Sequence, residues 1–110
     1  MIITHARTDD LAEIVGLERV GFDPAEQWSE AAWADELGSS ERHVLARLDR
    51  DGRIIGVATF SCVADMADLH RVIVRPDLRG HGIGASLVRA GLDWAAAVGA
   101  PGGGRADPGP

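Results

Sequence analysis

The chain has 110 residues, of which 45% are apolar and 25% are charged, and its formal net charge is −6. This length and composition predict one globular domain and exclude two. The acidic balance argues against nucleic acid as a partner, because phosphate backbones attract basic surfaces. Apolar runs fall short of the ~18 residues that span a bilayer, and the N-terminus lacks a signal-peptide pattern. Since Cys62 is the single cysteine, we expect a cytoplasmic protein that binds neither nucleic acid nor a membrane.

The N-terminal part of the chain predicts one strand and two helices. Residues 1–6 form a short apolar strand, and Thr8 is the expected N-cap of a helix whose apolar stripe fades near residue 22. Ser29 is the expected N-cap of a second helix. Trp28 and Trp33 stand on either side of that cap, at the spacing of a hydrophobic staple.

Three strands and a helix are predicted for the following part. Residues 43–48 and 54–60 flank a turn at Gly52, so they are predicted to form a hairpin. A further strand covers residues 67–74. A helix is predicted from residue 83 to about residue 98. Its inward face consists of apolar or small residues at spacings of three or four: Ile83, Leu87, Gly91, Trp94 and Val98.

The last residues differ in composition from those before them. Residues 100–110 are dominated by glycine and proline, which do not hold a helix or strand interior, so they are predicted to be a disordered tail. Residues 1–99 are predicted to form one domain. Its fold class is α/β, with a mixed, mostly antiparallel sheet of about four strands and with three helices, in the order β-α-α-β-β-β-α.

The most informative segment is the glycine-rich stretch at residues 79–85, which lies between a predicted strand and a predicted helix. Backbone N–H groups at such a helix start favour an anion, and glycines let a ligand approach the backbone closely. Nearby arginines add positive charge to an otherwise acidic chain: Arg71, Arg75, Arg79 and Arg89. We therefore predict a site for a phosphate-bearing ligand, against the alternative of a glycine-rich connector with solvated arginines.

Two other phosphate-binding motifs compete for this segment. A P-loop needs a lysine on the phosphates, and all 11 basic residues of this chain are arginine. The spacing Gly80-x-Gly82-x-x-Ala85 fits a relaxed dinucleotide-binding fingerprint. That fingerprint belongs on the first strand of a βαβ unit with an acid about 20 residues later, which Asp93 and Asp107 do not match. A dinucleotide-binding module therefore stays as the weaker alternative.

The motif Arg79-x-x-Gly82-x-Gly84 resembles that of the GNAT superfamily of N-acetyltransferases. The predicted element order resembles the opening of the same fold over residues 1–99. Trp28-Ser29-Glu30 with Trp33 is similar to the start of the second helix in the ribosomal-protein-alanine N-acetyltransferase subgroup, and Leu69–Pro76 is similar to its fourth strand.

The resemblance implies that acetyl-CoA is the co-substrate and that no metal takes part. The fourth strand would lie along the pantetheine arm and pair with it through backbone groups, at Val72, Ile73 and Val74. Plain core packing is the alternative role for these three side chains. The pyrophosphate would be held by the loop residues Arg79, Gly80, His81, Gly82, Ile83, Gly84 and Ala85.

The proton chemistry is less well defined. In the resembling subgroup a glutamate on a fifth strand is the base and a later tyrosine is the acid, but this sequence has no tyrosine and no fifth strand before its tail. Asp68 lies about where some related acetyltransferases carry the base, so it is the candidate catalytic residue, with a solvated carboxylate as the alternative. His70 follows on the same face by strand periodicity, and a structural role is its alternative.

These observations lead to an expected function. We expect an N-acetyltransferase that transfers acetyl from acetyl-CoA to an amine, such as a protein N-terminal amine, in a chain truncated before the C-terminal half of the family fold. One alternative is a non-catalytic remnant that binds acyl-CoA or a partner chain, and the other is the dinucleotide-binding module. Self-association is expected through the exposed strand at residues 67–74. The tail composition suggests a frameshift or a shortened gene.

Overall fold

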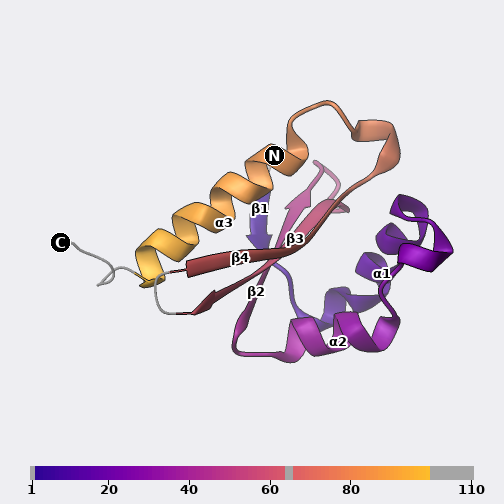
Figure 1. The fold of residues 1–110 in the computed structure, drawn as a ribbon. Coiled ribbons are helices and arrows are strands. Elements are labelled where there is room, and N and C mark those ends of the chain that lie inside the picture. The colour runs from indigo at the N-terminus through magenta and orange to yellow at the C-terminus, as the bar shows by residue number, and fades with distance from the viewer. Residues whose placement is uncertain (1, 64–65, 100–110) are drawn as a thin grey trace.

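The computed structural model describes residues 2–63 and 66–99. Four strands form one antiparallel sheet in the order β1-β2-β3-β4 (Figure 1). The strands are β1 (Ile2–His5), β2 (Arg42–Leu48), β3 (Ile54–Val63) and β4 (Met66–Val74). The helices are α1 (Leu11–Gly21), α2 (Glu30–Gly38) and α3 (Ile83–Gly99). The predicted fold class and element order are confirmed, and every strand pair in the described sheet is antiparallel. The predicted tail, residues 100–110, lies outside the described residues.

The sheet separates two layers of helices. Helices α1 and α2 cover one face, and α3 lies across the other (Figure 1). Each face has its own apolar core, one containing Ile14, Trp33 and Ile73 and the other containing Phe60 and Leu87. None of the helices among the described residues has the length and hydropathy of a membrane span.

The starts of the first two helices differ in how they are capped. The expected cap at Thr8 is wrong, because Thr8 begins a short 3-10 turn (Thr8–Asp10) and α1 follows at Leu11. The cap is made from the other end of that turn, where the Asp10 carboxylate accepts the backbone N–H of Arg7 at 2.9 Å. At α2 the expected cap is confirmed, since Ser29 Oγ accepts the N–H of Ala32 at 3.0 Å.

The hydrophobic staple at α2 is confirmed as well. The rings of Trp28 and Trp33 lie 5.0 Å apart between centroids, and Trp33 is completely buried. The staple therefore fixes the segment before α2 against the sheet.

Helix α3 packs closely against β3. A Cβ atom at Gly91 would lie 2.1 Å from Cζ of Phe60, so the helix can approach this ring only with glycine at that position. Ile83 and Leu87 are buried on the same side. The predicted inward face is confirmed as far as Trp94, and the side chain of Val98 lies outside the described part.

Candidate functional site

The predicted ligand loop connects β4 to α3. After β4 ends at Val74, a short 3-10 turn (Pro76–Leu78) leads into the glycines, and α3 starts at Ile83. Gly80 and Gly82 have φ angles of 88° and 80°, in the left-handed region where residues with a Cβ are strained. No atom lies within 4 Å of where a Cβ would stand at either glycine. The backbone of the loop is therefore open to a ligand.

The loop presents the start of a long helix. Helix α3 has 17 residues, and its first backbone bond joins the N–H of Ser86 to the carbonyl of Gly82 at 3.0 Å. The N–H groups before Ser86 are left without helix partners and point outward with the positive end of the helix dipole. Such a helix start can hold a phosphate or pyrophosphate group.

The helix start is held in place from two sides. A Cβ at Gly84 would be in contact with the side chains of Val74 and Val72, at 3.5 and 3.9 Å. Arg47 reaches across from β2 and donates to Ser86 Oγ at 2.6 Å. Sequence reasoning missed Arg47, because the two residues are 39 positions apart and neither stands out in a local pattern.

The predicted loop residues differ in exposure. Ile83 is buried in the core beneath α3, and Gly84 is half-buried. The others lie on the surface: Arg79, Gly80, His81, Gly82 and Ala85. Ile83 can therefore meet a ligand only through its backbone.

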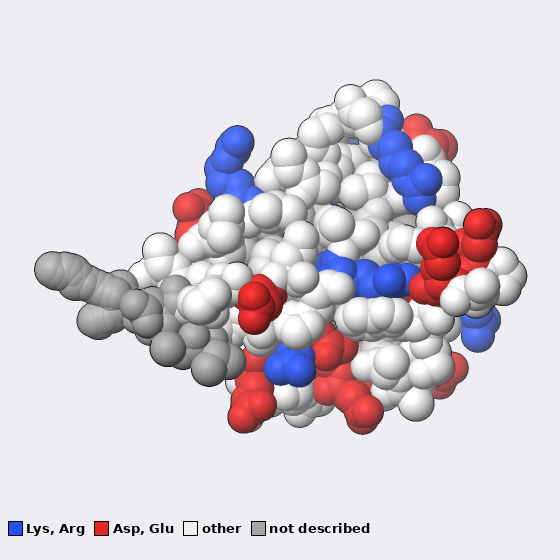
Figure 2. All heavy atoms as spheres, in the orientation of Figure 1, with Lys and Arg blue, Asp and Glu red and all other residues white. Residues whose placement is uncertain are grey.

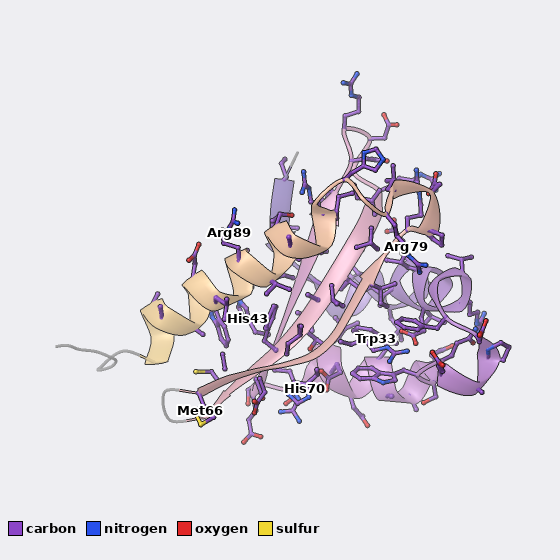
Figure 3. The ribbon with its side chains drawn as sticks, turned by 45° about the horizontal axis from the view of Figure 1, so that its top comes forward. Trp33, His43, Met66, His70, Arg79 and Arg89 are labelled. Atoms are coloured by element: carbon purple, nitrogen blue, oxygen red, sulfur yellow. The ribbon has the colours of Figure 1, made fainter. Side chains whose placement is uncertain are left out.

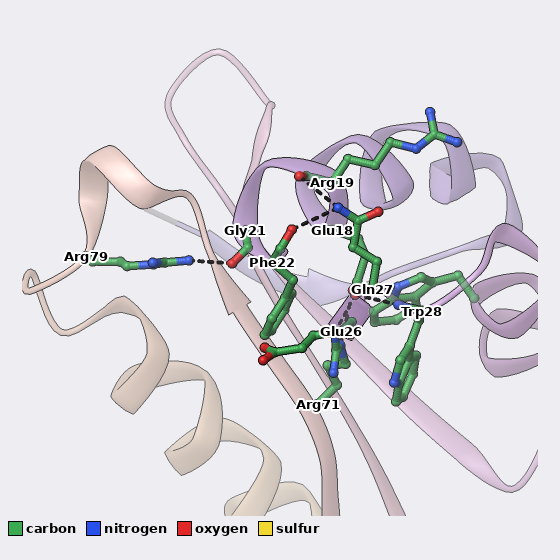
Figure 4. Close-up of polar contacts among 10 residues, drawn as sticks. Glu18, Arg19, Gly21, Phe22, Glu26, Gln27, Trp28, Arg71 and Arg79 are labelled. Atoms are coloured by element: carbon green, nitrogen blue, oxygen red, sulfur yellow. Dashed lines mark hydrogen bonds and ion pairs between the residues drawn. The ribbon is translucent and has the colours of Figure 1, made fainter. Parts of the chain in front are cut away.

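Three of the four arginines assigned to this region are engaged with the protein itself. Arg79 donates to the carbonyl of Gly21 at the end of α1, at 2.9 Å (Figure 4). Arg75 forms an ion pair with Asp77 at 2.7 Å, which raises the pKa of the arginine and lowers that of the aspartate. Arg71 forms an ion pair with Glu18 beneath α1. Arg89 lies on the exposed side of α3 (Figure 3).

The strand β4 forms an edge of the described sheet and pairs there with β3 alone. The side chains of Val72 and Val74 pack into the core under α3, and Ile73 is buried on the opposite face. For these side chains the core-packing interpretation is confirmed. Their backbone groups on the open side of the strand remain the predicted pantetheine contacts.

A buried charged network joins α1, the segment before α2 and β4. Glu18 is 1% exposed and accepts a hydrogen bond from the backbone N–H of Trp28 at 2.7 Å (Figure 4). It accepts a second one from Trp33 Nε1 at 3.0 Å. Arg71 donates to both carboxylate oxygens of Glu18 and to the carbonyl of Glu26 at 2.6 Å. Burial alone would raise the pKa of Glu18, but these donors together lower it below its ordinary value.

Two aromatic rings complete the surroundings of Arg71. Its guanidinium lies 3.8 Å from the ring centroid of Phe22 and 5.0 Å from that of Trp28. Both distances fall within the range of cation–π attraction. The network was missed from the sequence, although the charge at position 18, four residues after buried Ile14 on the inward stripe of α1, was an available signal.

A cavity of about 330 Å³ lies between α2 and β4. Its lining residues are Trp28, Ala32, Asp35, Glu36 and His70. Figure 3 shows His70 on the side of β4 that faces α2. The side chain of Glu36 is held by Thr59 Oγ1 at 2.6 Å and by Arg42 Nε at 3.1 Å. Asp68, the candidate from the sequence, is exposed and does not line this cavity.

The family model for the acetyltransferase (GNAT) family matches residues 8–102. The chain therefore belongs to the GNAT family, as its loop, its edge strand and its element order suggested. A comparison with curated protein sequences gave no significant match.

Solved structures of this family are similar to the chain. The ribosomal-protein-S18-alanine N-acetyltransferase from Escherichia coli is 24% identical with a TM-score of 0.77, and the match covers 86% of this chain and 59% of that one. The GphF GNAT-like decarboxylase in complex with isobutyryl-CoA is 22% identical with a TM-score of 0.78, covering 87% and 59%. The PaiA N-acetyltransferase from Thermoplasma acidophilum in complex with coenzyme A is 18% identical with a TM-score of 0.73, covering 86% and 72%.

These likenesses establish the fold. The chain spans 59% of the length of the first two structures. Because an acetyltransferase and a decarboxylase share the architecture, the chemistry must be argued from this chain's own site.

Proposed function

We propose that the chain binds acetyl-CoA and transfers its acetyl group to an amine. The observation that carries the proposal is the open loop at Gly80 and Gly82, which stands at the start of a 17-residue helix and directly beyond the end of an edge strand. In this proposal the pyrophosphate rests on the backbone of residues 79–85. The pantetheine arm runs along Val72–Val74 and pairs with the free backbone groups of β4.

The chemistry follows from the nature of the thioester. The amine must be neutral when its nitrogen attacks the carbonyl carbon, and the developing oxyanion needs a donor such as a backbone N–H. A bulge in β4 interrupts its ladder with β3 and leaves the extra residue unpaired. An N–H freed at this point is suited to polarise the thioester carbonyl.

The alternatives differ in how well the fold suits them. A dinucleotide-binding module needs a parallel βαβ unit, whereas all strand pairs described here are antiparallel. A non-catalytic acyl-CoA binder would use the same loop and strand and would differ only in lacking transfer. The acetylation of a protein N-terminal amine, pairing with a second chain at β4 and a cytoplasmic location stay predictions.

The test compares two glycines with the same backbone strain. Gly82 and Gly52 have φ angles of 80° and 81°, and neither has an atom within 4 Å of a Cβ position. Alanine at either position should cost about 1–2 kcal/mol of folding stability. We expect only Gly82→Ala to weaken acetyl-CoA binding in calorimetry, at least about tenfold, because Gly52 lies in the β2–β3 turn.

The outcomes separate the alternatives. Absence of acetyl-CoA binding by the unchanged chain, or equal affinity of the two variants, would refute the proposed site. Binding of acetyl-CoA without thiol release in the presence of amines would favour the non-catalytic binder.

A further inference from the structure

The bulge in β4 redirects one side chain. Thr59 pairs with Arg71 and Phe60 pairs with Leu69, so His70 is the extra residue of the strand. Regular alternation would send two successive side chains to opposite faces. Here Arg71 reaches Glu18 below α1, and His70 lines the cavity beside α2. The side chains of Arg71 and His70 therefore both lie on the face of the sheet that α1 and α2 cover.

The ring of His70 is anchored through one nitrogen. Its Nε2 lies 2.8 Å from Oγ of Ser61, a buried residue on β3. If Nε2–H donates to this oxygen, Nδ1 keeps its lone pair and can accept a proton. Imidazole is the side chain best suited to exchange a proton near neutral pH.

The walls of the cavity suit a positive charge. Trp28 contributes an aromatic ring to the lining, and the Arg71 guanidinium lies 5.0 Å from the centroid of that ring. Asp35 and Glu36 contribute carboxylates from α2. The charge of Glu36 is partly offset by Arg42, so Asp35 is the main free negative charge. Figure 2 shows acidic side chains gathered along the lower edge of this view, where α2 lies.

The cavity lies along β4 from the glycine loop, toward the start of the strand. Going back along β4 from Val74 beside the glycines, the strand passes Val72 and reaches His70. These four steps correspond to about 13 Å of extended strand. An arm bound at the loop and lying along this edge therefore leads to the bulge.

We propose that this cavity binds the acceptor as a primary ammonium ion and that Nδ1 of His70 takes its proton. This inference rests on the proposed acetyl transfer. The ammonium loses one proton to Nδ1, and the neutral nitrogen attacks the thioester carbon. The C–N bond forms and the C–S bond breaks, and the sulfur leaves as a thiolate that takes the second proton from nitrogen. Ser61 is a positioning residue, because it orients the ring.

The first experiment tests the cavity without turnover. L-alaninamide, a primary ammonium, is titrated into the chain and compared with N-acetyl-L-alaninamide, which carries no charge. We expect the first compound alone to shift the NMR signals of the His70 ring and the Trp28 indole, with weaker binding in Asp35→Asn. Equal shifts from both compounds, or none from either, would overturn the cationic site.

The second experiment tests the base. Ring ¹⁵N shifts should show an unprotonated Nδ1 in the neutral ring of His70, and Ser61→Ala should alter this preference. A proton on Nδ1 of the neutral ring would overturn the role. In turnover with alaninamide, His70→Gln should lower kcat by roughly 10²–10⁴ and remove the acidic limb of its pH profile.

The controls separate His70 from its neighbours and from the cofactor site. The affinity for acetyl-CoA should be the same in His70→Gln as in the parent chain. If the parent chain does not bind acetyl-CoA, the proposed function is refuted, but the alaninamide titration still tests the cavity. The other charged groups near the cavity are Asp35 and Glu36 on α2, Arg42 on β2, the Arg71–Glu18 pair and Asp68 on β4. A loss of kcat in Asp68→Asn as large as that of His70→Gln would assign the base to Asp68 and overturn the role of His70.

Discussion

The two faces of the sheet are held together by different chemistry. Under α1 and α2, the carboxylate of Glu18 is buried among directional bonds to Arg71 and Trp33. Under α3, contact is apolar and close, with Phe60 against Gly91. The charged face carries the cavity, and the apolar face supports the glycine loop. Hydrogen bonds therefore fix the elements around the cavity, whereas close apolar packing fixes the helix that follows the glycine loop.

The largest predicted effect comes from the charged face. Glu18→Gln removes the charge that balances Arg71 and weakens the bonds to Trp28 and Trp33. Because breaking a buried ion pair leaves the other charge uncompensated, we expect a loss of about 3–5 kcal/mol in the free energy of unfolding. Urea denaturation followed by tryptophan fluorescence measures it.

A surface ion pair provides the control for this variant. Arg75 and Asp77 form a pair at the same kind of distance, but both side chains are exposed. Asp77→Asn should leave the unfolding midpoint unchanged within error, since exposed pairs contribute little. Should Glu18→Leu combined with Arg71→Met be no more stable than Glu18→Gln, the uncompensated charge is not the cause of the loss.

The second prediction concerns the apolar face and uses two helical glycines. Gly91→Ala would force a Cβ against the ring of Phe60, and overpacking of this kind costs about 1–3 kcal/mol. Gly16 in α1 has nothing within 4 Å of its Cβ position, so Gly16→Ala should stabilise the chain by up to about 1 kcal/mol. Thermal unfolding of the two variants gives the comparison. Effects of the same sign would contradict the close approach of α3 to β3.

Much of this arrangement is visible in the sequence because it is local. The element order follows from apolar periodicity, and the loop follows from glycines at the start of a helix. Gly80 and Gly82 have the left-handed φ angles that a ligand-binding turn of this kind needs. Ser29 is also recognisable as a cap, because its bond reaches only three residues ahead.

The features that escaped the sequence depend on contacts between distant residues. Arg71 and Glu18 are 53 positions apart, and no local pattern pairs them. The bulge at His70 depends on the register of β3 against β4, which strand periodicity does not reveal. Asp68 was favoured on family position, whereas the cavity is lined by His70 and not by Asp68.

The third prediction returns to the apolar face, where the ring of His43 interrupts the apolar packing. The ring of His43 is stacked on Trp94 at 3.7 Å and meets His5 edge-on at 4.2 Å (Figure 3 shows His43 beneath α3). Its Nε2 is buried without a hydrogen-bond partner in the described structure. Burial, and secondarily the charge of His5, lowers the pKa of His43 from 6.5 to about 4.

The sign of the pH effect follows from proton binding. Between pH 6.5 and about 4 the unfolded chain binds a proton at residue 43 that the folded chain does not, so stability falls as the pH is lowered through this window. His43→Phe keeps the stack on Trp94 and removes the titration. We expect the stability lost between pH 7 and 4.5 to shrink by about 1–2 kcal/mol in this variant, since the ring is only half-buried. His81→Gln, on the exposed loop, should retain the parent slope in urea titrations across the same range. If the free energy of unfolding falls equally with pH in His43→Phe and in the parent chain, the apolar face tolerates a charged imidazole. The contrast between the two faces is then weaker than their contacts suggest.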